Sequence, residues 1–147
     1  MKDRKSHSNP ITTQVQVRFS DIDRLGHVTN TVYHQYFDIG RLAYFSQVLA
    51  EPLDWREKGL IMVSTSVDFI SPIKPNQLIE IRTSVSRLGN KSLAMNQEVF
   101  NLSLGRVAAN STSVMVFYNP AEDISQPIPP EWRTRIAAFE GEGLTQE

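Results

Sequence analysis

The chain has 147 residues and no cysteine, and its 15 Lys and Arg residues nearly balance its 16 Asp and Glu residues, giving a formal charge of -1 at pH 7. This length predicts one domain that can bury a core, and the missing cysteines exclude disulfides, thiolate nucleophiles and thiolate metal sites. The dispersed basic residues argue against nucleic-acid binding. Because the sequence has neither a membrane-spanning apolar run nor a signal peptide, we expect a cytoplasmic protein without a membrane span.

The first part of the chain is expected to contain a flexible tail and one strand. Residues 1–11 are polar and predict the tail. After them Val15, Val17 and Phe19 alternate with polar residues, which predicts a half-buried strand. The loop at residues 20–28 then delivers two carboxylates, a glycine and an imidazole to the start of the next element.

That element is a helix over residues 31–50, because apolar residues recur there at spacings of three and four. The apolar arc is wide, so we expect a central helix that other elements wrap. Gly40 in its interior costs roughly 1 kcal/mol relative to Ala, which indicates close approach of another backbone. Asp38 and Arg41 are expected to pair on its exposed edge. The side chains expected to cap its first turn are Thr29 or Asn30.

Four stretches of strand-like alternation follow a connector at residues 51–59. They are residues 60–70, 78–88, 92–100 and 106–118. Between the second and third of them, Gly89 and Asn90 are expected to supply positive φ in a tight hairpin turn. Consecutive strands after one helix predict an α+β fold in which an antiparallel sheet curls round the helix. The domain is expected at residues 12–119, and residues 120–147 are expected to hold a proline-rich connector and a short helix.

The pattern Asp21-x-Asp23 directly before the helix carries the best reactive constellation. It is not an EF-hand loop, because Leu25 and Val32 stand where oxygen ligands are required, and Asp21, Asp23 and His27 together have no specific metal geometry. The sequence also lacks a nucleophile elbow, a phosphate loop and a zinc-protease motif. What remains is a carboxylate beside the free amides of a helix N-terminus, an arrangement that suits acyl chemistry. We expect Asp21 to be a structural carboxylate.

Residues 19–38, FSDIDRLGHVTNTVYHQYFD, resemble the signature D-x-D-x-x-G-H-V-N-N-x-x-Y of hotdog-fold acyl-CoA thioesterases of the hydroxybenzoyl-CoA thioesterase class. The pieces VDFISPI at 67–73 and RLGNKS at 87–92 also resemble that family, and the similarity spans about residues 15–118. The resemblance implies a hotdog fold, in which a curved five-stranded antiparallel sheet wraps a long central helix. It also implies hydrolysis of an acyl-CoA thioester to the free acid and coenzyme A.

The resemblance implies a role for each matching residue. Asp23 would be the catalytic carboxylate, acting as nucleophile or as the base for water, and the backbone N–H of Asn30 would bind the thioester oxygen. His27 is either a participant in the chemistry or a hydrogen-bonded structural residue. This chain has Thr29 where the family often has Asn. The difference removes any role of an amide side chain at this position, but a role for backbone N–H groups at the start of the helix is unaffected. The residues expected to shape and line the site are Gly26, His27 and Tyr33.

The implied partner is a small-molecule acyl-CoA, with no metal or other cofactor. Arg82, Arg87 and Lys91 are candidates to meet its phosphates, although basic residues on strands are usually solvated. The family also implies a homodimer, or a dimer of dimers, with sheets joined edge to edge and each site built from two chains.

Two other functions stay open. The first is a hotdog enzyme that hydrolyses acyl carrier protein thioesters or hydrates enoyl thioesters, with Asp23 and His27 as an acid–base pair. Product analysis distinguishes hydration, because it leaves the thiol blocked. The second is a non-catalytic module for acyl-CoA binding or assembly, which would retain ligand affinity without turnover.

Overall fold

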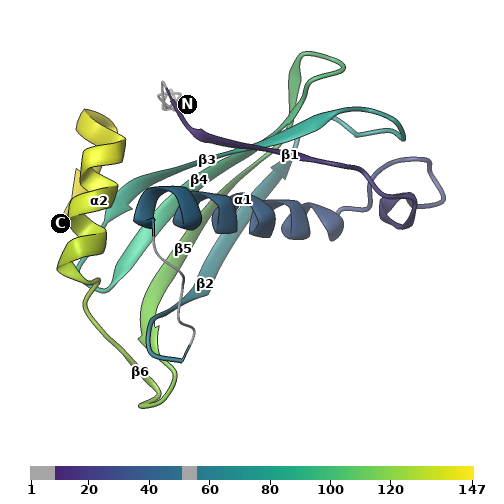
Figure 1. The fold of residues 1–147 in the computed structure, drawn as a ribbon. Coiled ribbons are helices and arrows are strands. Elements are labelled where there is room, and N and C mark those ends of the chain that lie inside the picture. Colours follow the sequence, from purple (N-terminus) through teal and green to yellow (C-terminus); the bar gives the residue numbers. More distant parts are fainter. Residues whose placement is uncertain (1–8, 51–55) are drawn as a thin grey trace.

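A computed structural model describes residues 9–50 and 56–147, and it has the predicted α+β hotdog architecture. Figure 1 shows one long helix, α1, lying across a curved sheet, with a second helix, α2, at one end. The strands follow the order β1-β3-β4-β5-β2, and two short strands pair with β5 and β3. The bounds are β1 Ile11–Val15, α1 Val32–Leu49, β2 Gly59–Phe69, β3 Ile79–Leu88, β4 Ser92–Asn101, β5 Arg106–Asn119, β6 Ile124–Ser125, α2 Pro130–Glu140 and β7 Thr145–Gln146.

Residues 1–8 of the expected tail and residues 51–55 of the expected connector lie outside the described residues. The described part of the chain contains no helix that is long and apolar enough to span a membrane. The five main strands were each predicted, although β1 begins earlier in the chain than expected, and all five are antiparallel neighbours in the order β1, β3, β4, β5, β2.

α1 lies very close to the sheet at Gly40, although the predicted neighbour, another backbone, is not what approaches it. A Cβ atom at this position would lie 2.6 Å from Cγ2 of Ile81, 2.7 Å from Oγ1 of Thr83 and 2.8 Å from Nε2 of Gln97. The approaching atoms are therefore side-chain atoms of β3 and β4, whereas the sequence analysis expected another backbone.

A buried polar network holds α1 on the sheet beside Gly40. Arg41 pairs with Asp38 as predicted, but the expectation that this pair lies on the exposed edge is wrong for Arg41, which is only 6% exposed. The guanidinium also donates to Oε1 of Gln97 at 2.9 Å. Gln97 in turn donates from Nε2 to the Phe37 carbonyl at 2.9 Å and to Thr83 Oγ1 at 3.0 Å. These bonds satisfy polar groups that would otherwise destabilise the core.

Three local expectations are wrong. The first strand ends at Val15, and Phe19 lies in a short 3-10 helix with its side chain 99% exposed. The N-cap position of α1 is Thr31, not Thr29 or Asn30, and no side chain accepts a capping hydrogen bond there. The positive-φ residues of the described chain include neither Gly89 nor Asn90, so that turn is formed without left-handed backbone.

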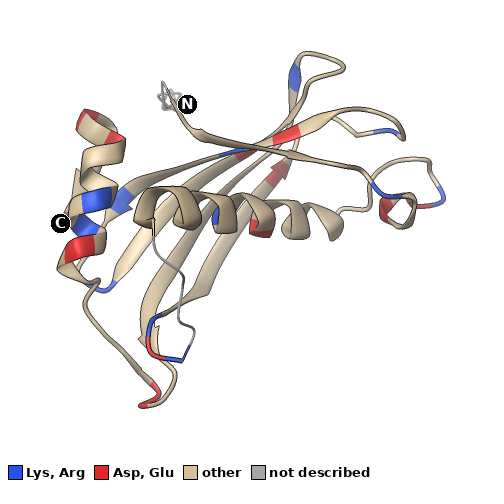
Figure 2. Cartoon of the chain, in the orientation of Figure 1, with Lys and Arg blue, Asp and Glu red and all other residues tan. Residues whose placement is uncertain are grey.

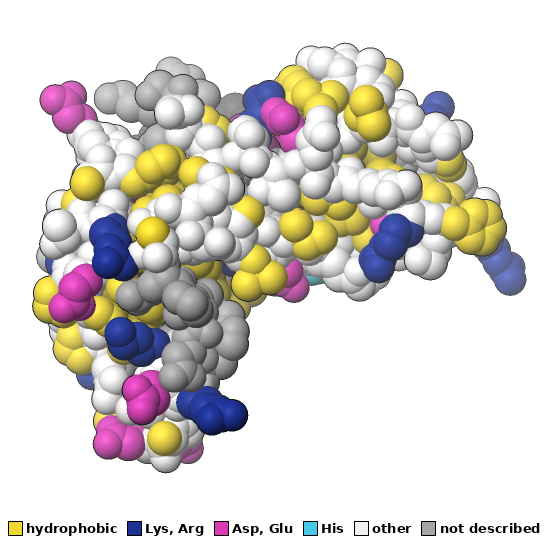
Figure 3. Space-filling model, in the orientation of Figure 1, with side chains coloured by type: hydrophobic (Ala, Val, Ile, Leu, Met, Phe, Trp, Pro, Cys, Tyr) yellow, Lys and Arg dark blue, Asp and Glu magenta, His cyan; other side chains and the backbone are white. Residues whose placement is uncertain are grey.

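The outer face of α1 is more exposed than expected for a helix that other elements wrap. Ile39 and Leu42 are 41% and 53% exposed, although both belong to the predicted apolar arc. Figure 3 shows hydrophobic side chains at the surface over α1 and β1. The other faces of α1 pack mainly against β1, β3, β4 and α2.

The C-terminal helix α2 closes the core at the end where α1 stops. Trp132 and Ile136 of α2 are 1% and 0% exposed and join the apolar cluster of that end. At the end of α2, Oε1 of Glu140 accepts hydrogen bonds from the Tyr44 hydroxyl at 2.6 Å and from the Val85 N–H at 2.7 Å. This buried carboxylate therefore joins α2 to α1 and β3.

Candidate active site

The loop between the first 3-10 helix and α1 is held by backbone hydrogen bonds at several points. Within the loop, the Asp23 N–H donates to the His27 carbonyl at 2.9 Å, and the Thr29 N–H donates to the Asp21 carbonyl at 2.9 Å. Gly26 has φ of +79°, a conformation that favours glycine, so the predicted tight turn is present at this residue. The loop is thereby fixed next to the helix start.

Asp21 is a structural carboxylate, as expected. Its side chain is 1% exposed, and its Oδ2 accepts bonds from the Arg18 N–H at 2.9 Å and the Tyr36 hydroxyl at 2.7 Å. The Arg18 guanidinium donates to Oδ1. Burial by itself raises the pKa of Asp21, but these hydrogen bonds and the charge of Arg18 outweigh it and hold the pKa below its usual value. Asp21 thus anchors the loop in its ionised form.

Asp23 differs from Asp21 because its carboxylate is exposed and bonds only to its own loop. Oδ1 accepts hydrogen bonds from the backbone N–H groups of Leu25 at 2.9 Å and His27 at 3.4 Å. Both bonds end on one oxygen, and the second oxygen accepts no hydrogen bond from residues 9–50 and 56–147. This geometry orients the carboxylate and leaves part of it for a ligand.

A cavity of about 430 Å³ lies between this loop, the start of α1 and the end of β2. Four of the predicted site residues line it together: Asp23, His27, Asn30 and Tyr33. Its other walls were not assigned from the sequence, although the piece VDFISPI overlaps them. They are Leu25, Val28, Thr29, Phe69, Ile70, Ser71 and Pro72.

The start of α1 leaves backbone donors free at this cavity. Val32 and Tyr33 donate to the carbonyls of Thr29 and Asn30. For the N–H groups of Asn30 and Thr31, in contrast, the described part of the chain offers no hydrogen-bond acceptor. Unpaired N–H groups at a helix N-terminus favour an anionic ligand, because they combine free donors with the positive end of the helix dipole.

Tyr33 is a fixed wall of the cavity. It is 3% exposed, and its ring contacts the ring of Phe69 edge to face, with centroids 5.1 Å apart and an interplanar angle of 82°. Burial raises the pKa of the Tyr33 hydroxyl, and a hydrogen bond from the Ile73 backbone partly offsets this rise. The hydroxyl is therefore neutral near pH 7 and acts as a packing and hydrogen-bonding group.

Arg87 and Lys91 do not reach this cavity within the chain. The Phe117 N–H donates to the Lys91 carbonyl, and Phe117 pairs with Leu60 near the start of β2. The cavity lies at the other end of β2, about 30 Å away along an extended strand of this length. Figure 2 shows basic residues at both ends of the molecule, interspersed with acidic ones.

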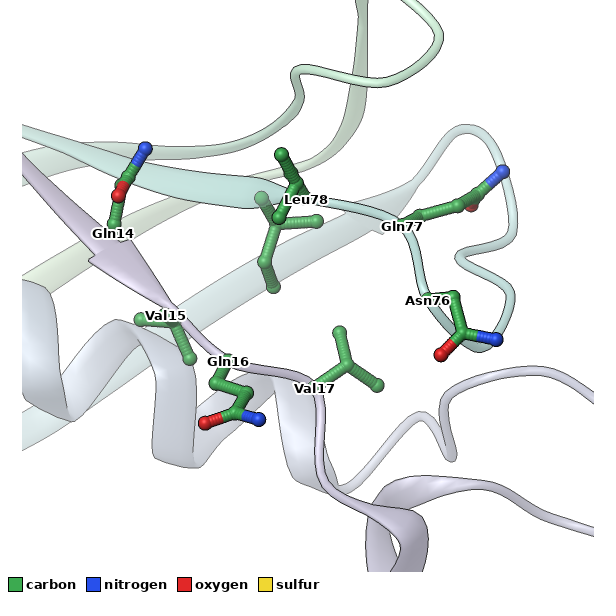
Figure 4. Close-up of a pocket in the computed structure, with 8 residues that line it drawn as sticks. Gln14, Val15, Gln16, Val17, Asn76, Gln77 and Leu78 are labelled. Atoms are coloured by element: carbon green, nitrogen blue, oxygen red, sulfur yellow. The ribbon is translucent and has the colours of Figure 1, made fainter.

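A second hollow of about 550 Å³ lies where β1 and β3 separate (Figure 4). It is lined by the segment from Gln14 to Val17 and the segment from Asn76 to Ile79. Its polar side chains are all amides, which neither ionise nor act as nucleophiles. Although it is larger than the Asp23 cavity, it holds no group for acid–base or nucleophilic chemistry. Across residues 9–50 and 56–147, no group of three or more His, Asp or Glu side chains is arranged to hold a metal ion.

The sequence profile of the thioesterase-like superfamily matches residues 17–136, which include the site loop, α1 and strands β2 to β5. The chain therefore belongs to the thioesterase-like superfamily. This membership confirms the resemblance drawn from the motif at residues 19–38 and supports thioester hydrolysis as the general chemistry.

Solved structures and one curated protein are similar to the chain. A thioesterase from Thermus thermophilus, solved in complex with coenzyme A and Zn, is 31% identical, with a TM-score of 0.78 over 90% of this chain and 96% of that chain. The uncharacterized protein YsmA of Bacillus subtilis (strain 168) is 28% identical over 103 residues, which are 70% of this chain and 69% of YsmA. A mutant 4-hydroxybenzoyl-CoA thioesterase complexed with 4-hydroxybenzoyl-CoA has a TM-score of 0.77 at 21% identity, covering 86% of this chain and 97% of that chain, and shares the fold.

Proposed function

We propose that the protein hydrolyses an acyl-CoA thioester to the free acid and coenzyme A. The observation that carries this proposal is that the Asp23 carboxylate and the free N–H of Asn30 line the same cavity. A thioester carbonyl that accepts the Asn30 N–H would gain stabilisation as negative charge develops on its oxygen. Asp23 lines the same cavity, and its carboxylate would either attack the carbonyl carbon or remove a proton from the attacking water.

The two roles of Asp23 differ in their intermediates. As a nucleophile, its oxygen forms a mixed anhydride with the acyl group and expels the coenzyme A thiolate, after which water cleaves the anhydride. As a base, it takes a proton from water, which adds to the carbonyl before the thiolate leaves. In either route the thiolate needs a proton, and the His27 imidazole at the cavity is the group that we assign to this transfer.

The test is thiol release from a panel of acyl-CoAs by the wild type and by Asp23→Asn. We expect the variant to lose at least about 100-fold in kcat, the usual scale for a catalytic acid, base or nucleophile. The matched control is Glu142→Gln, which removes an exposed carboxylate in the turn after α2, outside both the cavity and β2, and should keep the wild-type rate. Wild-type turnover by a folded Asp23→Asn protein would remove Asp23 from the mechanism. Binding of acyl-CoA without any thiol release by the wild type would favour the non-catalytic module.

We also propose that the active form is a homodimer joined through β2. This strand is an edge of the sheet, and its apolar residues Ile61, Met62 and Val63 are 43%, 38% and 57% exposed. A long edge with exposed apolar side chains pairs readily with another strand. A monomeric mass at micromolar concentration in sedimentation experiments would count against this proposal.

Antiparallel pairing of two β2 edges would give Arg87 and Lys91 a role. In such a dimer the end of β2 near Leu60 in one chain lies beside the end near Phe69 in the other. The Lys91 turn of one chain would then lie at the same end of the joined sheet as the Asp23 cavity of the other. We expect the double variant Arg87→Ala/Lys91→Ala to raise KM for acyl-CoA and to leave KM unchanged for an acyl N-acetylcysteamine thioester, which has no phosphates. Equal effects on both thioesters would refute phosphate binding.

A further inference from the structure

We propose that the ring pair of Tyr33 and Phe69 closes the acyl end of the Asp23 cavity, so that the enzyme takes compact acyl groups, with Phe69 as the residue that limits their length. The inference rests on the proposed thioester hydrolysis and goes beyond it by naming the substrate class. Both rings line the cavity, and they meet edge to face with centroids 5.1 Å apart.

Phe69 is directed toward α1 by the register of the sheet. It pairs with Ala109 of β5, which is 0% exposed and packs in the same apolar cluster as Tyr33. β2 ends at Phe69, because the N–H groups of both Ile70 and Ser71 turn to the Ala108 carbonyl and a proline follows. The ring therefore lies at a defined position where the strand meets the cavity.

Tyr33 is buried in the core, whereas Phe69 is exposed enough to be substituted with little loss of packing. Tyr33 is 3% exposed and is held by its packing in the buried apolar cluster between α1 and the sheet. Phe69 is 46% exposed, so its loss removes less core packing than the loss of a buried ring. Removing the Phe69 side chain should open the wall with a limited effect on stability.

Beyond the ring pair, β2 continues with smaller side chains on the face of Phe69. Side chains two residues apart share a face of a strand, so Val67 and Thr65 follow Phe69 on the face toward α1. Val67 is half-buried against the cluster that contains Tyr33, and Thr65 is exposed. A longer acyl chain could follow this face only if the Phe69 ring were absent or displaced.

The lining of the cavity fits a compact acyl group at this position. Val28, Tyr33, Phe69 and Ile70 provide apolar walls, whereas the polar groups Asp23, His27 and Asn30 come from the loop and the helix start. An aromatic acyl ring would pack well against two rings that already meet edge to face. A cavity of about 430 Å³ is at the small end of the range for ligand sites.

The experiment compares butyryl-, benzoyl- and lauroyl-CoA with the wild type and with Phe69→Ala, measuring both kcat/KM for thiol release and Kd by calorimetry. We expect the wild type to prefer butyryl- or benzoyl-CoA to lauroyl-CoA. In Phe69→Ala the ratio of lauroyl to butyryl kcat/KM should rise by about tenfold or more, because differences in apolar pocket filling discriminate on this scale. The matched control is Leu104→Ala in the turn between β4 and β5, which is 46% exposed, like Phe69, and lies outside both the cavity and β2, so it should keep the wild-type ratio.

A chain-length preference that Phe69→Ala leaves unchanged in both turnover and binding would overturn the inference. A wild type that prefers lauroyl-CoA would overturn it as well. If no thioester is cleaved by the wild type, the proposed hydrolysis fails, and the Kd ratios alone decide on the length limit. The two failures are therefore distinguishable.

Discussion

Replacing Gly40 by Ala tests how closely α1 approaches the sheet. In an exposed helix interior this change stabilises a protein by roughly 0.8–1.0 kcal/mol, because Ala has the higher helix propensity. In this chain the new Cβ would lie 2.6, 2.7 and 2.8 Å from atoms of Ile81, Thr83 and Gln97. Each of these distances is about 1 Å shorter than an ordinary contact.

The three neighbouring atoms have little freedom to move away. Ile81 and Thr83 are β-branched residues of a central strand, with restricted rotation about χ1. Gln97 is held by its bonds to the Phe37 carbonyl and to Thr83. We take about 2 kcal/mol for overpacking and about 1 kcal/mol for the weakened Gln97 bonds, and subtract about 1 kcal/mol for helix propensity. The expected result is destabilisation by about 2 kcal/mol.

Urea unfolding followed by circular dichroism would measure this change at one fixed protein concentration, because oligomer stability depends on concentration. The midpoint should fall by about 1 M for an m-value near 2 kcal/mol/M. Ser46→Ala on the exposed face of α1 is the matched control and should stabilise by a few tenths of a kcal/mol. A Gly40→Ala protein at least as stable as the wild type would refute the close approach.

Three further predictions concern buried polar groups. Asp21→Asn should lower the free energy of unfolding by about 2 kcal/mol at pH 7. Because folding lowers the pKa of Asp21 from 3.8, this difference in stability from wild type should be present above pH 3.8 and shrink below it. Acid unfolding curves that differ by a constant amount at all pH values would contradict this. Glu140→Ala should lower the free energy of unfolding by about 3 kcal/mol, because it leaves two buried donors, the Tyr44 hydroxyl and the Val85 N–H, without an acceptor. Glu140→Gln keeps an acceptor, so its loss of stability in thermal unfolding should be smaller. Ser71→Ala removes a buried hydroxyl that has no hydrogen-bond partner among the described residues. The free energy of unfolding from denaturant titrations should therefore stay within about 0.5 kcal/mol of wild type or rise, and a loss above about 1 kcal/mol would indicate a partner.

Local periodicity was enough to predict most of the elements. The helix was expected at residues 31–50 and is observed at Val32–Leu49, and the strand expected at 106–118 is observed at Arg106–Asn119. Such patterns succeed because one face of each element is buried, and burial of one face imposes the period. The first strand shows the limit, since alternation continues to Phe19 while pairing with β3 stops at Val15.

The polar interior could not be predicted from local pattern, because its partners are distant in sequence. Arg41 lies 56 residues before Gln97, and nothing near Arg41 indicates that a glutamine of another element will accept its hydrogen bond. Phe69 was not predicted as a site residue for the same reason, because only the fold brings its ring against Tyr33. The motif identified the site residues that are adjacent in sequence, but it did not identify the cavity wall that the sheet supplies.

The two aspartates of the loop show how one motif divides structural and chemical work. Asp21 uses both carboxylate oxygens on Arg18 and Tyr36, and this bonding ties the loop to α1. Because Asp21 supplies that anchorage, the carboxylate of Asp23 can remain exposed on the cavity with only one oxygen engaged by its own loop. Loss of Asp21 should therefore impair thioester cleavage indirectly, through the position of Asp23, and an Asp21→Asn variant with wild-type kcat would show that the loop keeps its geometry without this anchor.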